Sequence, residues 1–280
     1  MRVLLLGGTG SIGSAVLREL VGRRHEVVAL ARSDASAAKI QAAGGVAVAG
    51  DIATPTAWIR TLPSLDAVIH MACDFKADMA AVDRQLLDAL LPYLAVQRQR
   101  ARLIYTGGGW LFGATGDRVA TESSPFAPLP AFAWMVPHLQ RVLASPGADG
   151  IVIHPAMVHG GDGGVFRRFA DDAASGRPVR VVGGEDVRWP LVHREDLAVL
   201  YALALERAPP RSSWLGVDVE GLAVGRIARS FSAELEIVPA DAIAAELGEW
   251  ARGYGCDQQL SGAKARRDLG WEPARELLSA

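Results

Sequence analysis

The glycine-rich segment 7–13 is the part of the sequence whose residue types and spacing point most directly to chemistry. It follows an apolar run, precedes a helical pattern, and reads Gly-Gly-Thr-Gly-Ser-Ile-Gly. Glycines let a backbone turn sharply and approach a pyrophosphate, whose charge is held by exposed N–H groups and by the positive end of the helix. A glycine turn that binds nothing is the alternative. We therefore expect a dinucleotide to contact Gly7, Thr9, Gly10, Ser11, Ile12 and Gly13.

The stretch after the next apolar run bears on which dinucleotide this would be. An NAD-binding fold places an acidic residue there, against the ribose 2′-hydroxyl, but this chain reads Leu-Ala-Arg-Ser at 30–33. A guanidinium and a hydroxyl suit a 2′-phosphate, so Arg32 and Ser33 favour NADP(H) over NAD(H). Asp34 leaves NAD(H) open, because a shifted turn could bring its carboxylate to the ribose. A solvated surface arginine is the structural alternative for Arg32.

The elements that must position these residues follow a βαβ rhythm. Continuous apolar runs, rather than alternating ones, are typical of strands buried on both faces of a parallel sheet. Such runs occur at 3–6, 25–30, 46–49, 67–70, 102–105 and 150–153, with helical patterns at 14–21, 79–91 and 137–144. The pattern predicts the α/β class, with a Rossmann-type doubly wound parallel sheet.

The rhythm breaks after His154, where Pro155 and the glycine run 160–164 indicate an irregular loop. A helix at 194–206 and a strand at 214–219 could return to the sheet. We therefore expect an NADP-binding Rossmann domain at 1–155, joined by about 190–219. A small C-terminal substrate-binding lobe is expected at 156–189 and 220–280.

The spacing Gly-x-x-Gly-x-x-Gly resembles the fingerprint of extended short-chain dehydrogenase/reductases, in the branch of NAD-dependent epimerases and dehydratases. Similar segments follow in order along nearly the whole chain, at 50–52, 68–72, 105–106, 154–160, 189–198 and 261–273. The resemblance implies a homodimer and further cofactor contacts. These are Asp51 and Ile52 at the adenine, Met71, Ala72 and Cys73 at the pyrophosphate and ribose, Thr106, and Pro155, Met157 and Val158 at the nicotinamide.

The chain departs from that family at its catalytic motif. Family members carry Tyr-x-x-x-Lys after the fifth strand, where the lysine lowers the pKa of the tyrosine that transfers the proton. Here Trp134 and His138 occupy that spacing, and none of the four tyrosines has a lysine four residues later. An indole N–H does not release a proton near neutral pH, whereas an imidazole can. Thr106, Trp134 and His138 are the candidate catalytic residues, although Pro137 could displace the helix and turn His138 away.

The missing motif leaves three functions open. In the first, an atypical oxidoreductase or epimerase-like enzyme moves hydride between NADP(H) and a small molecule, and Thr106, His138 or a water supplies the proton. In the second, the nucleotide is structural or sensed, and the protein is a redox-silent regulator. In the third, the fold performs a non-redox isomerisation or cyclisation. We expect the first.

Aromatic residues occur in the segments expected to enclose the substrate, where they would suit a flat or apolar ligand. The candidates for substrate contact are Gly108, Trp110, His159 and Trp189. Core packing is the alternative for either tryptophan, and a local hydrogen bond is the alternative for His159.

Composition excludes several other partners. The 280 residues are 50% hydrophobic, which allows a large core, and the net charge of −2 argues against nucleic acid, since phosphate binding needs a basic surface. No apolar run approaches the ~20 residues of a membrane span, so no membrane partner is expected. Two cysteines, Cys73 and Cys256, allow no disulfide framework, and their spacing from the histidines indicates no metal. A reducing cytoplasmic location fits best.

Overall fold

The computed structural model describes residues 1–161 and 163–277, and the chain divides into two compact units. The first unit comprises Met1–Gly107, Pro137–Ile153 and Glu195–Ser213, and the second comprises Gly108–Val136, His154–Arg194 and Trp214–Ala280. The segment 108–136, which the sequence placed in the nucleotide-binding domain, groups with the second unit. Which ligand each part binds remains a prediction.

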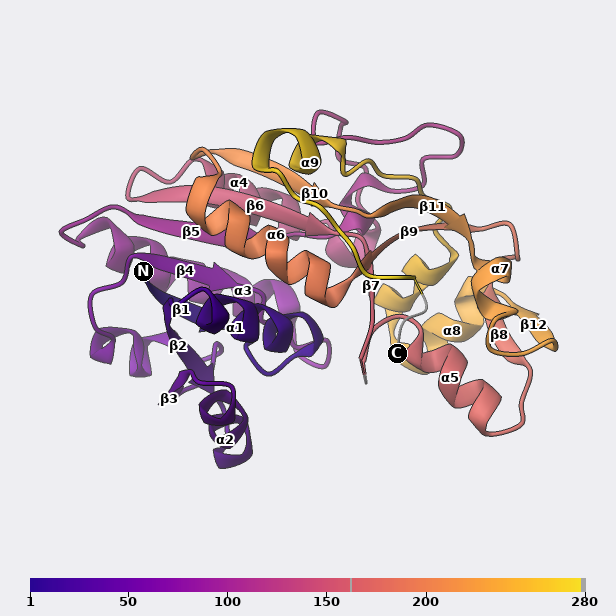
Figure 1. Ribbon diagram of the computed structural model, residues 1–280, viewed down its shortest axis with the longest axis horizontal. Helices are drawn as coiled ribbons and strands as arrows, with labels where there is room; N and C mark the ends of the chain where they lie inside the picture. The colour runs from indigo at the N-terminus through magenta and orange to yellow at the C-terminus, as the bar shows by residue number, and fades with distance from the viewer. Residues whose placement is uncertain (162, 278–280) are drawn as a thin grey trace. The chain divides into compact units, whose positions relative to one another are not determined.

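The first unit is built around a seven-stranded sheet, whose strand order is β10-β6-β5-β4-β1-β2-β3 (Figure 1). Neighbouring strands from β3 to β6 are parallel, which confirms the predicted α/β class and Rossmann-type doubly wound sheet. Side chains 3–6 of β1 are fully buried, as expected for a strand covered on both faces. The strands are β1 (Arg2–Leu6), β2 (Glu26–Ala31), β3 (Val46–Ala49), β4 (Ala67–His70), β5 (Ala101–Thr106), β6 (Ala148–Pro155) and β10 (Ser212–Gly216).

The helices of this unit pack in neighbouring pairs. Helices α1 (Ser11–Gly22) and α6 (Arg194–Arg207) are joined by an ion pair between Arg18 and Glu195, 2.7 Å apart. Helices α3 (Met79–Ala95) and α4 (Met135–Leu143) are joined by Arg141 and Asp88, 2.6 Å apart. The other helical segments are α2 (Asp34–Ala42) and the short 3₁₀ turns Pro55–Ala57 and Ile59–Thr61.

The second unit has two small sheets, β11-β9-β7 and β12-β8. Its core contains the ring of Phe169, stacked on Trp189 with centroids 5.7 Å apart. The strands are β7 (Met157–His159), β8 (Val179–Val182), β9 (Arg188–His193), β11 (Val219–Ala223) and β12 (Leu235–Val238). The helices are α5 (Arg167–Ala174), α7 (Val224–Ala228), α8 (Ala240–Leu247) and α9 (Ala263–Leu269), with 3₁₀ turns at Gly109–Phe112, Pro130–Phe132 and Glu249–Gly255.

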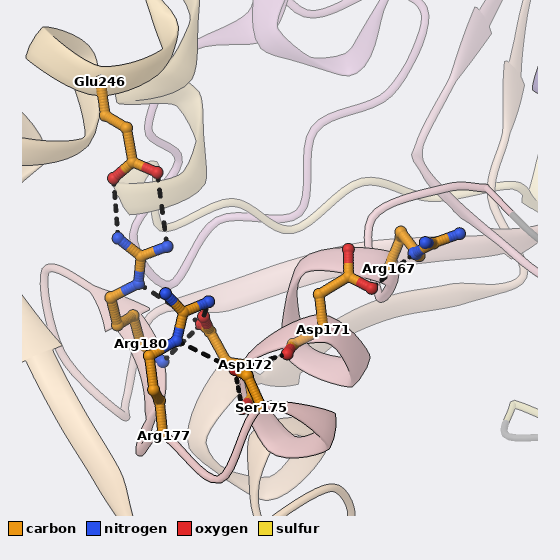
Figure 2. Close-up of polar contacts among 7 residues, drawn as sticks. All are labelled: Arg167, Asp171, Asp172, Ser175, Arg177, Arg180 and Glu246. Carbon is orange, nitrogen blue, oxygen red and sulfur yellow. Dashed lines mark hydrogen bonds and ion pairs between the residues drawn. The ribbon is translucent and has the colours of Figure 1, made fainter.

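A buried carboxylate, Asp172, ties α5 to β8 in the second unit (Figure 2). It is 1% exposed and accepts hydrogen bonds from Arg177 Nη2 at 3.1 Å and from the backbone N–H of Arg180 at 3.3 Å. The guanidinium of Arg180 continues to Glu246 on α8, at 2.7 Å. Three elements of this unit are therefore connected through two carboxylates.

Candidate functional site

The loop between β1 and α1 is tightly folded around its glycines. Gly7 has φ +92°, and a Cβ added there would lie 2.9 Å from the backbone nitrogen of Ala72. A Cβ on Gly13 would lie 2.0 Å from the carbonyl oxygen of Gly7. The loop thus needs glycine at both positions, at Gly7 for its φ and at both for close backbone approach.

The backbone N–H groups in the first turn of α1 have no side-chain acceptor at the N-cap. Its N-cap is Gly10, which provides no side-chain acceptor, and the first turn contains no acidic residue. Within the described part of the chain, the buried hydroxyl of Ser11 has no hydrogen-bond partner. Thr9 and Gly10 are exposed, and Ile12 is half-buried. An uncapped helix start with an orphaned hydroxyl fits a phosphate group, because phosphate oxygens accept from such donors.

Arg32 and Ser33 follow the end of β2 directly. The Arg32 side chain is 60% exposed, and its Nη1 lies 3.1 Å from Asp74 Oδ2. Hydrogen bonds from the backbone of Lys76 and from Arg32 hold the pKa of Asp74 below its usual value. Ser33 caps α2 by accepting from the backbone N–H of Ser36. The guanidinium is therefore accessible, with a carboxylate as its present partner.

The remaining predicted cofactor residues of the first unit line the ends of β3 and β4. Asp51 Oδ1 accepts from the backbone N–H of Ala53 at 2.9 Å, and Ile52 is buried. The backbone N–H of Met71 donates to Leu6 O, which places 71–73 beside the end of β1. Partial burial and the carboxylates of Asp83 and Asp74 raise the pKa of the Cys73 thiol to about 12, so this thiol stays protonated.

Thr106, at the end of β5, is held by a tyrosine. Its Oγ1 lies 2.6 Å from the hydroxyl of Tyr201 on α6. Tyr201 is fully buried, and burial raises its pKa. Tyr201 therefore remains a neutral phenol at physiological pH.

His138 lies in a buried polar cluster of the first unit. Its Nδ1 is 2.6 Å from Asp83 Oδ2, and only 8% of the residue is exposed. The sequence left open that Pro137 displaces this helix, but Pro137 lies within α4. It occupies the first turn of α4, where its missing N–H interrupts no hydrogen bond.

The predicted substrate residues and the other predicted catalytic residue, Trp134, belong to the second unit. Trp110 packs against Trp250 and Tyr254, with centroids 6.5 and 6.0 Å apart. Apart from its chain neighbours, no described atom lies within 4 Å of a Cβ added to Gly108. His159 is buried and stacks on Phe166.

Two indole nitrogens of this unit donate hydrogen bonds to backbone carbonyl oxygens. Trp189 Nε1 donates to Tyr254 O at 2.9 Å, and Trp134 Nε1 donates to Ala131 O at 3.1 Å. The three predicted nicotinamide contacts lie close together in sequence here, with Pro155 at the end of β6 and Met157 and Val158 in β7.

Sequence reasoning missed Asp83, His70, Tyr105 and Tyr201. A signal for Asp83 was present, because it shares one helical face with Leu86, Leu87 and Leu90, all fully buried. A carboxylate on such a face needs buried partners. No local pattern identified those partners.

Among the described residues, no helix is long and apolar enough to cross a membrane. No group of three or more His, Cys, Asp or Glu side chains able to hold a metal ion occurs in that part of the chain.

Known proteins share this architecture. A family model described as the NAD dependent epimerase/dehydratase family matches residues 3–214. An uncharacterized protein of Schizosaccharomyces pombe is 30% identical, over 99% of this chain and 97% of its own. The 2-alkyl-3-oxoalkanoate reductase of Stenotrophomonas maltophilia is 28% identical, over 77% of this chain and 68% of its own.

The fold also matches solved structures. A double mutant of the dTDP-glucose 4,6-dehydratase DesIV from Streptomyces venezuelae, with NAD bound, has a TM-score of 0.83 at 20% identity. The match covers 99% of this chain and 93% of that one. Together with the family match, this confirms the resemblance predicted from the glycine spacing and the later segments. The chain belongs to the NAD-dependent epimerase/dehydratase family of extended short-chain dehydrogenase/reductases.

Proposed function

We propose that this protein is an NADP(H)-dependent carbonyl reductase of small molecules, with His138 as its proton donor in place of the family's tyrosine. The observation that carries the proposal is the 2.6 Å contact between His138 Nδ1 and the buried carboxylate of Asp83. A redox-silent nucleotide sensor has no need of an imidazole held in this way. The reductase among its relatives supports the same reaction class.

When bound, NADPH supplies the hydride for such a reduction. The carbonyl carbon of the substrate receives that hydride, and the carbonyl oxygen takes the proton that the His138 imidazolium gives up. The products are an alcohol, NADP⁺ and neutral His138. The loop 7–13 would hold the pyrophosphate, and Arg32 and Ser33 the 2′-phosphate.

Fluorescence titration with NADPH and NADH, followed by NADPH oxidation with a panel of ketones that includes 3-oxo acids, tests the proposal. We expect NADPH to bind more tightly than NADH and at least one ketone to be reduced. Tight NADPH binding without turnover would favour the redox-silent or non-redox alternatives. Failure to bind either nucleotide would overturn the proposal.

Arg32→Ala should weaken NADPH binding while leaving NADH almost unaffected, because only NADPH carries the 2′-phosphate. Charge-assisted hydrogen bonds contribute about 1.5–3 kcal/mol, so a loss of roughly 10- to 100-fold in NADPH affinity is expected. Asp74→Asn should act in the opposite direction, since it releases the guanidinium from its present partner.

The matched control for Arg32 is Arg60→Ala, at another exposed arginine of the first unit. It should leave both dissociation constants unchanged. Equal losses of NADPH and NADH affinity in Arg32→Ala would show that Arg32 does not recognise the 2′-phosphate, and no loss of either would make Arg32 a solvated surface residue.

His138→Ala should lower kcat by about 10²- to 10⁴-fold, the usual contribution of a general acid. The dissociation constant of NADPH should change far less, because the variant removes a proton donor rather than a phosphate ligand. His25→Ala, a histidine at the turn into β2, is the control and should keep wild-type kcat. Unchanged turnover in His138→Ala would transfer the role to Thr106 or to water.

A further inference from the structure

We propose that Asp83 is a positioning residue that fixes the tautomer and orientation of His138, and that His70 and Tyr105 hold Asp83 in place. The proposal rests on the proposed function, because it assigns the residue that prepares the proton donor.

One carboxylate receives three side chains from three other elements of the first unit. Asp83 projects from α3, and its Oδ1 lies 2.7 Å from His70 Nε2, at the end of β4. Its Oδ2 lies 2.6 Å from His138 Nδ1 on α4 and accepts from the Tyr105 hydroxyl on β5 at 3.0 Å. All four residues are buried, with exposed fractions of 1% to 8%.

The ionisation state of Asp83 determines which atoms of Tyr105, His70 and His138 must carry a hydrogen. Burial alone would raise the pKa of this carboxyl, but the hydrogen bonds and charges of His70 and His138 outweigh it, and the pKa lies below its usual value. At neutral pH Asp83 is therefore an ionised acceptor, which has no proton to donate. Burial and the Asp83 charge raise the pKa of Tyr105 well above its usual value, so Tyr105 donates as a neutral phenol.

Both imidazole tautomers follow from this. Each ring nitrogen that faces the carboxylate must carry a hydrogen, so His138 is protonated on Nδ1 and His70 on Nε2. Nε2 is then the nitrogen of His138 that gains and loses a proton. His70 differs, because its Nδ1 is buried and has no hydrogen-bond partner among the residues that the structure describes. The hydrogen bond that His70 makes in this cluster is the one that holds the carboxylate.

A purely structural role would not require these polar residues, because apolar side chains could give the same stability. The face of α3 that carries Asp83 otherwise presents buried leucines, including Leu86 and Leu87. Well-packed apolar side chains are often as stabilising as a buried ionic cluster, or more so. Another titratable neighbour of Asp83, Cys73, is a protonated thiol and adds no charge. The cluster is better explained by control of His138.

Asp83→Asn tests the proposal in two ways. An amide can donate as well as accept, so it permits the wrong imidazole tautomer, and kcat should fall by about 10²- to 10⁴-fold with little change in NADPH affinity. The pH profile of kcat should shift as well. In the His138→Ala background the same substitution should have no further effect on kcat, since Asp83 acts through His138.

Nitrogen-15 NMR of the histidine side chains supplies a readout that does not depend on turnover. We expect the wild type to show the Nδ1–H tautomer of neutral His138, and Asp83→Asn to show a mixture or the Nε2–H form. Asp88→Asn, at an exposed residue of the same helix, is the control and should change neither kcat nor the tautomer.

The outcomes separate this proposal from the function on which it rests. An Nε2–H tautomer in the wild type, or additive losses of kcat in the double variant, would overturn the role of Asp83. A wild type that reduces no ketone would overturn the proposed function, while the NMR spectra would still decide whether Asp83 controls His138. If Asp83→Asn fails to fold, the wild-type spectrum still tests the proposal, because an Nε2–H tautomer of His138 would overturn it.

Discussion

Gly13→Ala should abolish nucleotide binding at concentrations that saturate the wild type. The added methyl carbon would lie 2.0 Å from the carbonyl oxygen of Gly7 and 2.7 Å from its carbonyl carbon, and both are backbone atoms that cannot rotate away. The loop 7–13 must therefore move, and with it the N–H groups expected to hold the pyrophosphate. We expect NADPH affinity to fall by at least roughly 100-fold, or about 2.7 kcal/mol, by fluorescence titration.

Gly22→Ala, in the same helix α1, is the matched control. Apart from its chain neighbours and the backbone of its own helix, no described atom lies within 4 Å of a Cβ added at Gly22, so the variant should bind NADPH like the wild type. It should also unfold with a free energy higher by up to about 1 kcal/mol, since alanine favours a helix over glycine. Wild-type affinity in a folded Gly13→Ala would show that the loop does not contact the nucleotide.

Asp172→Ala should lower the free energy of unfolding of the second unit by about 3 kcal/mol. The variant removes a carboxylate that is 1% exposed. The backbone N–H of Arg180 and one N–H of each guanidinium, of Arg177 and of Arg180, then lose this acceptor (Figure 2). Urea denaturation followed by tryptophan fluorescence would measure the loss, because Trp189 lies in the core of the same unit.

Its neighbour Asp171 offers a control one residue away. Asp171 pairs with Arg167 across one turn of α5, and both side chains are more than half exposed. Asp171→Ala should therefore change the free energy of unfolding by no more than about 0.5 kcal/mol. Equal effects of the two substitutions would contradict the role given to burial at Asp172.

The nucleotide-binding proposal and the proposal for Asp83 and His138 can both be tested without knowing the substrate. Substitutions in the loop 7–13 and at Arg32 test nucleotide affinity, whereas substitution of Asp83 tests the tautomer of His138. A substrate panel is needed only for turnover. The glycine loop 7–13 and the buried imidazole of His138 can therefore be examined one at a time.

The sequence by itself determined the class of the fold and the place of the glycine loop between β1 and α1. Apolar runs such as 3–6 indicate strands buried on both faces, and the glycine spacing of 7–13 specifies a turn between strand and helix; both depend on neighbours within a few residues. Arg32 could be placed for the same reason, because it directly follows β2. The departure from Tyr-x-x-x-Lys was likewise visible in the order of residues alone.

Only the tertiary structure decided what surrounds His138. Asp83 is separated from its three partners by 13, 22 and 55 residues, and they meet because the order of strands places β4 beside β5 while α4 packs on α3. The partner of Thr106 is a further 95 residues along the chain, on α6. Local periodicity carries no information about such distant pairs, since they depend on which elements become neighbours when the sheet assembles and on which buried polar groups must then satisfy one another.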